Sequence, residues 1–165
     1  MKLCLRDAFA SPSFNKTYNY RFSKDELGEL PAPLVSDAVE AEVTVEGQNG
    51  YVTCEIKIEG TFEVLCGRCA KPFELNFVNV TTKPVLRDDG VCDEDAVYLN
   101  SAMCFDINDE VFARLCFEFP MVPLCSEDCK GLCPVCGCDL NVESCSCDTK
   151  TVDPRLAVLK NLFDK

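Results

Sequence analysis

The chain has 165 residues, of which 47% are hydrophobic, and a formal net charge of −12. This length predicts one domain, or one domain with a small appendage, and the apolar content suffices for a core. No stretch approaches the ~20 consecutive apolar residues of a membrane-spanning helix, and the start lacks the apolar segment of a secretion signal. We therefore expect a cytoplasmic protein. An acidic chain repels phosphate backbones at long range, which favours basic partners over unspecific RNA binding.

The N-terminal third contains two clear patterns. Ser23 followed by Glu26 predicts the start of a short helix. From Ala38 onward apolar residues alternate with polar ones as far as Glu46, and the alternation resumes from Val52 to Ile58. Because four turn-forming residues (47–50) separate the two runs, the pattern predicts a β-hairpin with one solvated face. Cys54 lies on the apolar face and is expected to be buried.

Two shorter runs, 61–65 and 73–80, flank Cys66-Gly67-Arg68-Cys69 and predict a second hairpin with this CxxC motif at its tip. The acidic stretch 85–97 is interpreted as a solvated connection. Asp106 then predicts a helix start, with a buried stripe of Ile107, Val111 and Leu115 and an end near Phe117. Cys104 and Cys116 are expected in the core around this helix.

The composition changes after residue 120, where cysteines become dense and large apolar residues scarce. Such a segment cannot be held together by burial alone. Asp153 and Pro154 predict a last helix with an apolar stripe (Leu156, Leu159, Leu162 and Phe163). The predicted fold is α+β: an antiparallel sheet or partly open barrel with a few helices over 1–120, and a Cys-rich zinc-binding segment with a C-terminal helix, packed on that body, over 121–165.

The 14 cysteines are far more than average usage. In a secreted chain they would indicate disulfides, but in a reducing cytosol metal ligation is the better interpretation. Cys-x-x-Cys and Cys-x-Cys spacings close poor disulfide loops and readily bring two thiolates onto one ion. We therefore expect about two zinc ions per chain.

The strongest motif is Cys133-Pro134-Val135-Cys136-Gly137, which is typical of a zinc knuckle because the glycine permits a tight backbone around the sulfurs. Cys145 and Cys147 follow closely and complete a local four-thiolate site, although the nearby Cys138 could compete with them.

The second predicted site joins Cys66 and Cys69 with Cys125 and Cys129. One alternative is a redox pair of Cys66 and Cys69, but a thioredoxin-like CxxC opens a helix, whereas a strand follows here. In another alternative the two CxxC motifs share one ion and the four remaining cysteines hold the other. The local arrangement is preferred because it closes a shorter loop.

The chain contains no histidine, which excludes histidine bases and Ser–His or Cys–His dyads. All-thiolate zinc sites are usually closed and structural, and no phosphate-binding glycine motif is present. We therefore expect no enzymatic activity and no small-molecule substrate.

Several segments together resemble the YceD family of large ribosomal RNA subunit accumulation proteins. They are Cys66-Gly67-Arg68-Cys69 with Pro72-Phe73, the run from Pro123 to Gly137, Asp139-Leu140-Asn141, Cys145-Ser146-Cys147 and Asp153-Pro154-Arg155-Leu156-Ala157. The resemblance spans about 36–165 and implies a role in accumulation of 23S ribosomal RNA. It also supports pairing Cys66 and Cys69 with Cys125 and Cys129. Cys138 departs from the family motif, which commonly has another residue there.

The leading hypothesis is a non-enzymatic assembly factor that contacts a precursor large ribosomal subunit through a basic ribosomal protein, rRNA or both. Arg68, Lys71 and Lys130 are the basic side chains best placed to touch RNA. The alternatives are a rubredoxin-like redox protein with iron in place of zinc, and a zinc-dependent interaction module in transcription or metal storage.

Overall fold

The computed structural model describes residues 1–87 and 95–148 of the chain. Along the chain it contains β1 (Lys2–Cys4), α1 (Arg6–Ala10), β2 (Ser13–Phe22), α2 (Lys24–Leu27), β3 (Val39–Gln48), β4 (Tyr51–Leu65), β5 (Pro72–Arg87), β6 (Val97–Leu99), β7 (Cys104–Asp106) and α3 (Ile107–Glu118). The predicted α+β class with an open sheet and few helices is confirmed. The predicted C-terminal helix lies outside the described residues.

Two compact units divide the chain. The first, called the body, comprises Met1–Val64 and Pro72–Met121. The second, called the cysteine unit, comprises Leu65–Lys71 and the chain from Val122 onward. The β4–β5 turn thus belongs with the C-terminal segment, although some sixty residues separate them in the sequence.

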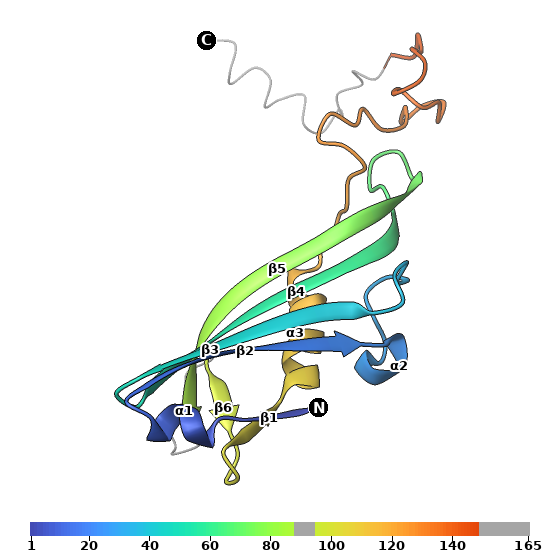
Figure 1. Ribbon diagram of the computed structural model, residues 1–165. Coiled ribbons are helices and arrows are strands. Elements are labelled where there is room, and N and C mark those ends of the chain that lie inside the picture. The colour runs from blue at the N-terminus through green and yellow to red at the C-terminus, as the bar shows by residue number, and fades with distance from the viewer. Residues whose placement is uncertain (88–94, 149–165) are drawn as a thin grey trace, which may run out of the picture. The chain divides into compact units, whose positions relative to one another are not determined.

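A five-stranded sheet with the order β2-β3-β4-β5-β6 forms most of the body (Figure 1). The predicted first hairpin is confirmed, since β3 and β4 pair antiparallel with Gln48 opposite Tyr51. Only Asn49 and Gly50 form the turn, at φ values of 50° and 84°. A two-residue hairpin turn requires such positive φ angles, which asparagine and glycine tolerate best.

The second hairpin is longer than the sequence predicted. Run 61–65 continues β4 without a break, although Gly60 interrupts the alternation; a side chain at Gly60 would meet the Phe62 ring at 3.1 Å. β5 extends through Arg87, and Val97 belongs to β6, so both ends of the expected 85–97 connection are strand rather than loop. Cys92, within that stretch, lies outside the described residues.

The N-terminal segment, which the sequence left unassigned, contributes β1, α1 and the sheet-edge strand β2. Lys16 falls on the inward side of β2, where its ammonium group lies over the Tyr18 ring at 4.8 Å from the centroid. The predicted short helix is α2, and its capping box is formed, with both the Ser23 N–H and its hydroxyl donating to the Glu26 carboxylate.

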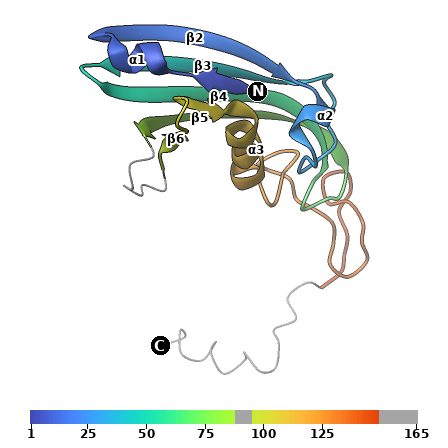
Figure 2. The ribbon, with the colours of Figure 1, turned by 90° about the horizontal axis from the view of Figure 1, so that it is seen from below.

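The apolar core lies between the sheet and α3, which packs against one face of the sheet (Figure 2). α3 begins at Asp106, whose carboxylate accepts the Asn108 N–H, and it buries Ile107, Val111 and Leu115 as predicted. Phe62 is fully buried and meets the Phe119 ring edge-on, with centroids 5.2 Å apart. The buried Lys83 forms an ion pair at 2.7 Å with Glu110 of α3, which is partly buried.

Cysteines in the body behave differently from one another. Cys54 is fully buried as predicted, and burial raises its thiol pKa to about 12. Cys104 is buried but forms a disulfide with Cys4, its directly opposite residue in the β1–β7 pair. The metal interpretation therefore does not extend to this pair. The prediction that Cys116 packs in the core was wrong: it is exposed, because it follows Leu115 by about 100° around the helix.

None of the described helices is long and apolar enough to cross a membrane.

Candidate metal centres

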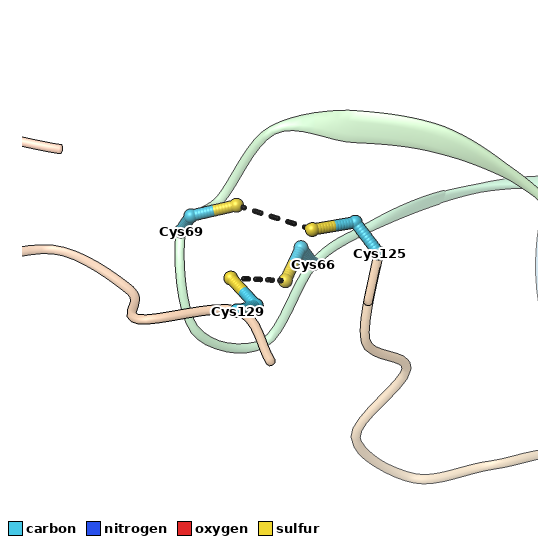
Figure 3. A group of neighbouring side chains, drawn as sticks. All are labelled: Cys66, Cys69, Cys125 and Cys129. Carbon is cyan, nitrogen blue, oxygen red and sulfur yellow. Dashed lines mark hydrogen bonds between the residues drawn. The ribbon is translucent and has the colours of Figure 1, made fainter. Parts of the chain in front are cut away.

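The first cluster consists of Cys66 and Cys69 from the β4–β5 turn together with Cys125 and Cys129 (Figure 3). The Cys66 and Cys129 sulfurs are 3.8 Å apart, and the Cys69 and Cys125 sulfurs are 3.7 Å apart. Four sulfurs about 2.3 Å from a central tetrahedral ion would be separated by about 3.8 Å. A disulfide would bring two sulfurs to about 2.0 Å. The spacing therefore fits a tetrathiolate metal site.

The turn that carries Cys66 and Cys69 is fixed by its own backbone. The Cys66 N–H donates to the Lys71 carbonyl at 2.9 Å, and the Ala70 N–H donates to the Cys66 carbonyl at 2.9 Å. Ala70 adopts φ 56°, an uncommon conformation for a residue with a side chain. These bonds fold the turn tightly enough for both sulfurs to face one point.

Arg68 attaches this turn to the segment that supplies Cys125 and Cys129. Its guanidinium donates to the Glu127 carbonyl at 3.0 Å and to the Cys129 carbonyl at 2.9 Å. Its own carbonyl accepts the Leu132 N–H at 3.1 Å. Gly131 adopts φ 75° and lies against the backbone of Arg68: a Cβ at this position would meet the Arg68 carbonyl oxygen at 2.9 Å. Glycine is thus needed for both conformation and space.

A polar network supports the sulfur of Cys129. The Asn141 side-chain amide lies 3.5 Å from this sulfur. The same amide donates a hydrogen bond of 2.8 Å to the Asp139 carboxylate, which fixes its orientation. Lys71 pairs with the same carboxylate at 2.5 Å and holds the pKa of Asp139 at about 2. Such outer contacts orient ligands and tune a metal site.

The second cluster consists of Cys133, Cys136, Cys145 and Cys147, whose sulfurs all lie within 4.8 Å of one another. The knuckle is closed by two backbone bonds of 2.8 Å, from the Gly137 N–H to the Cys133 carbonyl and from the Cys133 N–H to the Cys138 carbonyl. Gly137 adopts φ 76°, as expected for the glycine of this motif. Only Cys133 is buried here, so this cluster is more solvent-accessible than the first.

Cys138 stands beside the second cluster rather than within it. Its thiol neighbours those of Cys136 and Cys145, and these sulfurs raise its pKa to about 12. Its backbone carbonyl already serves the knuckle. Sequence spacing alone could not separate Cys138 from Cys145 and Cys147 as candidate ligands.

The electrostatics of both clusters call for a cation. Backbone N–H groups, that of Cys125 foremost, lower the pKa of Cys66 to about 6, and those of Cys136 and Val135 do the same for Cys133. Neighbouring sulfurs raise the pKa of Cys125 and of Cys147 to about 12. Without a positive ion, each cluster thus favours one thiolate and opposes a second, that of Cys125 or Cys147. A bound divalent ion removes that opposition.

The structure brings together all eight predicted site residues, in the two local groups that the sequence favoured. Their role as metal ligands stays a prediction. Two of the three basic side chains proposed to contact RNA have partners within the cysteine unit: Arg68 binds backbone carbonyls, and Lys71 binds Asp139. Asn141 and Asp139 were not predicted as supporting residues; the one signal for them in the sequence was the Asp139-Leu140-Asn141 motif of the family resemblance.

The family model of the large ribosomal RNA subunit accumulation protein YceD matches residues 54–163 of this chain. The matched region contains both cysteine clusters. The chain belongs to the YceD family. Similar curated proteins include uncharacterized proteins of Mycobacterium tuberculosis and Mycobacterium bovis, each 30% identical to this chain over 102 residues. These matches cover 59% of this chain, and the chain spans about half the length of the relatives. No solved structure matches it.

The family found by this comparison is the one that the cysteine motifs resemble, and the two four-cysteine clusters could each hold a metal ion. The resemblance inferred from the cysteine motifs is thereby confirmed.

Proposed function

We propose that this protein is a non-enzymatic, cytoplasmic zinc-binding factor in biogenesis of the large ribosomal subunit, needed for accumulation of 23S rRNA. Two observations together support the proposal: the family match, and the tetrathiolate spacing of the first cluster. All-thiolate sites without histidine are usually closed and structural, so the ions would hold shape rather than activate a substrate. The predicted division into 1–120 and 121–165, with the C-terminal helix packed on the body, stays a prediction.

The proposed partner is a precursor large subunit, reached through a basic ribosomal protein, rRNA or both. A chain with net charge −12 attracts basic proteins at long range, and each loaded tetrathiolate site would add further negative charge. Arg68 and Lys71 already have partners inside the cysteine unit. Of the three basic side chains considered for RNA contact, this leaves Lys130, for which the described contacts include no side-chain partner. This distribution favours a protein over RNA as the first contact.

The functional test is depletion of the protein in cells followed by quantification of ribosomal RNA. We expect the ratio of 23S to 16S RNA to fall, and the tagged protein to sediment with large-subunit precursors on a gradient. An unchanged ratio would contradict the assembly role, whatever the metal content.

The metal is tested separately on purified protein. We expect elemental analysis to give about two zinc per chain. The second candidate, a rubredoxin-like iron protein, is favoured by the same tetrathiolate geometry, since iron accepts four thiolates as zinc does. A ferric tetrathiolate is red and zinc is colourless, so a red preparation with stoichiometric iron would support the redox protein instead.

A further inference from the structure

Among the described residues, no strand lies beside one border of the sheet over most of its length. β5 runs from Pro72 to Arg87 with β4 on one side and β6 on the other, but β6 pairs only with Val85–Arg87. Over the described ranges, no loop or helix donates or accepts a backbone hydrogen bond along 73–83. Half of the backbone N–H and C=O groups along that stretch therefore face outward, as they do on any sheet edge.

Between Glu74 and Lys83, this border lacks the charges and prolines that usually protect an edge strand. Residues 75–82 contain no charged side chain, proline or glycine. Val78 and Val80 are 59% and 54% exposed. The opposite edge, β2, carries Lys16 and Arg21. Natural sheets place charges or prolines on edges to prevent unwanted pairing, so an uncharged, β-prone edge with exposed valines indicates a surface kept available for a partner.

The neighbouring surface defines which partner fits. The Thr61 hydroxyl donates to the Asn76 side chain at 3.0 Å, so these two residues share one face of the sheet. By the alternation of strands, that face of β5 also presents Glu74, Val78 and Val80, while β4 presents Glu55, Glu59 and Glu63. The one lysine among these β4 positions, Lys57, is already paired with Glu59 at 2.7 Å.

A strand added beside β5 would place alternate side chains next to the two valines and Glu74, with the β4 carboxylates one strand further away, at about 10 Å. Apolar or β-branched residues would suit the valines, and lysine or arginine would suit the carboxylates. A second copy of this chain fits less well, because it would bring another Glu74 and another net charge of −12 to the same border. Charge thus selects a basic occupant.

We propose that the β5 edge over 76–82 binds an extended, lysine- or arginine-containing segment of a partner protein by adding a strand to the sheet. Main-chain hydrogen bonds would supply affinity, and the valine and glutamate positions would supply specificity. The proposal names the kind of contact that the proposed assembly factor makes and rests on that function for the identity of the partner as a basic ribosomal protein.

The test compares two lysine substitutions with the same charge change. Val80→Lys places a positive charge at the β5 edge, and Thr53→Lys places one on the same face of the sheet but on β4, opposite Glu46 and away from that edge. The probe is a labelled ten-residue peptide alternating valine or threonine with lysine, and affinity is read by fluorescence anisotropy. We expect the wild type and Thr53→Lys to bind alike and Val80→Lys to bind about tenfold more weakly or worse.

Several outcomes would overturn the proposal. Equal weakening by both substitutions would mean unspecific attraction, and no binding by the wild type would mean that the edge accepts no basic strand. Tighter binding of a uridine oligomer, lost in Val80→Lys, would assign the edge to RNA. A wild-type dimer that Val80→Lys converts to monomer would assign it to a second copy. Unchanged circular dichroism and zinc content confirm that each variant folds.

Complementation separates this contact from the assembly role. If depletion lowers the 23S to 16S ratio and Thr53→Lys restores it while Val80→Lys does not, both the role and the edge are supported. If both variants restore it and bind the peptide equally, the edge proposal fails and the role stands. If depletion leaves the ratio unchanged while Val80→Lys still loses the peptide, the role fails and the edge stands.

Discussion

The body and the cysteine unit reach order by different physical means. The body buries a continuous apolar cluster in which residues such as Phe62, Ile58 and Leu115 are almost completely hidden from solvent. In the described part of the cysteine unit, the buried residues are four cysteines and Gly131, and apolar side chains such as Val135 and Val142 are 64% and 75% exposed. Burial supplies the stability of the first unit, whereas the second requires bonds that converge on sulfur. We expect from this contrast that one chain combines a self-sufficient scaffold with a unit whose shape depends on bound metal.

The largest effect that would test this contrast is metal removal. Binding of structural zinc to a small four-ligand site contributes on the order of 10–16 kcal/mol, far more than the residual core of the cysteine unit can replace. We expect Cys133→Ser, or treatment with a chelator, to abolish hydrogen-exchange protection in the segment 131–148. The β3 and β4 amides should keep theirs. Cys116→Ser, at an exposed cysteine, is the control. If amides of both units stay protected in a metal-free sample, the cysteine unit does not need metal for its structure and the contrast is refuted.

Acid, like metal removal, should destabilise the cysteine unit before it destabilises the body. The most acidic thiols, Cys66 and Cys133, have a pKa of about 6, well below the usual value of 9.0, before any bound ion adds its charge. A lowered pKa in the folded state means that the thiolate's contribution to stability is present at high pH and is lost as pH falls through the folded value. A bound ion lowers the pKa further, so zinc should stay bound at pH 7 and be released only below about pH 6.

The measurement is a titration with a zinc-sensitive dye, followed by circular dichroism of the β-sheet at each pH. We expect zinc release without loss of the sheet signal at the onset of release. Release already at pH 8 would be inconsistent with these thiols as ligands.

Phe62→Ala should have the opposite effect: it should destabilise the body and leave zinc binding by the cysteine unit unchanged. Truncation of a fully buried phenylalanine costs about 3–5 kcal/mol, and Phe62 also contacts the Phe77 and Phe119 rings. We expect a corresponding decrease in the free energy of unfolding in urea, with zinc content unchanged in the folded protein. Tyr51→Ala, at a tyrosine that is 64% exposed, should change stability little. Loss of zinc from folded Phe62→Ala would show that the sites depend on the core.

The smallest predicted effect concerns the support of one ligand. Asn141→Ala removes the amide that lies against the Cys129 sulfur. Removing such an outer contact typically weakens metal affinity about 10–100-fold, which should appear as faster zinc transfer to a competing chelator from the first cluster alone. The neighbouring Val142→Ala, at an exposed side chain, should leave the transfer rate unchanged.

How far the sequence predicts the molecule differs between the units for physical reasons. The α3 boundaries, the α2 capping box and the β3–β4 hairpin follow local rules, so a few neighbouring residues sufficed. β2 escaped prediction because Lys16 interrupts its inward alternation. A lysine is accepted there because it stays exposed on this edge strand and its ammonium group lies over the Tyr18 ring. The end of β4 was divided at Gly60 because a glycine usually ends a strand, whereas here it leaves room for the Phe62 ring.

Contacts between distant residues were harder to predict than the clusters themselves. The cysteine spacings favour binding of each pair to one ion, so eight candidate ligands could be named from sequence, and a family resemblance supported their grouping. No spacing rule joins Cys4 to Cys104, a hundred residues apart, because their meeting depends on the pairing of two three-residue strands. Asn141 likewise gains its role only when folding places it at Cys129.

The separation of ligands in the first cluster has a consequence for synthesis of the protein. Cys66 and Cys129 lie 63 positions apart, whereas the second cluster is complete within a short stretch of chain. At 5–20 residues per second, the hairpin cysteines leave the ribosome roughly 3–13 s before their partners do. During that interval two closely spaced thiols have no second pair with which to share an ion. The yield of correctly assembled protein should therefore depend on the reducing capacity of the cell as well as on its zinc.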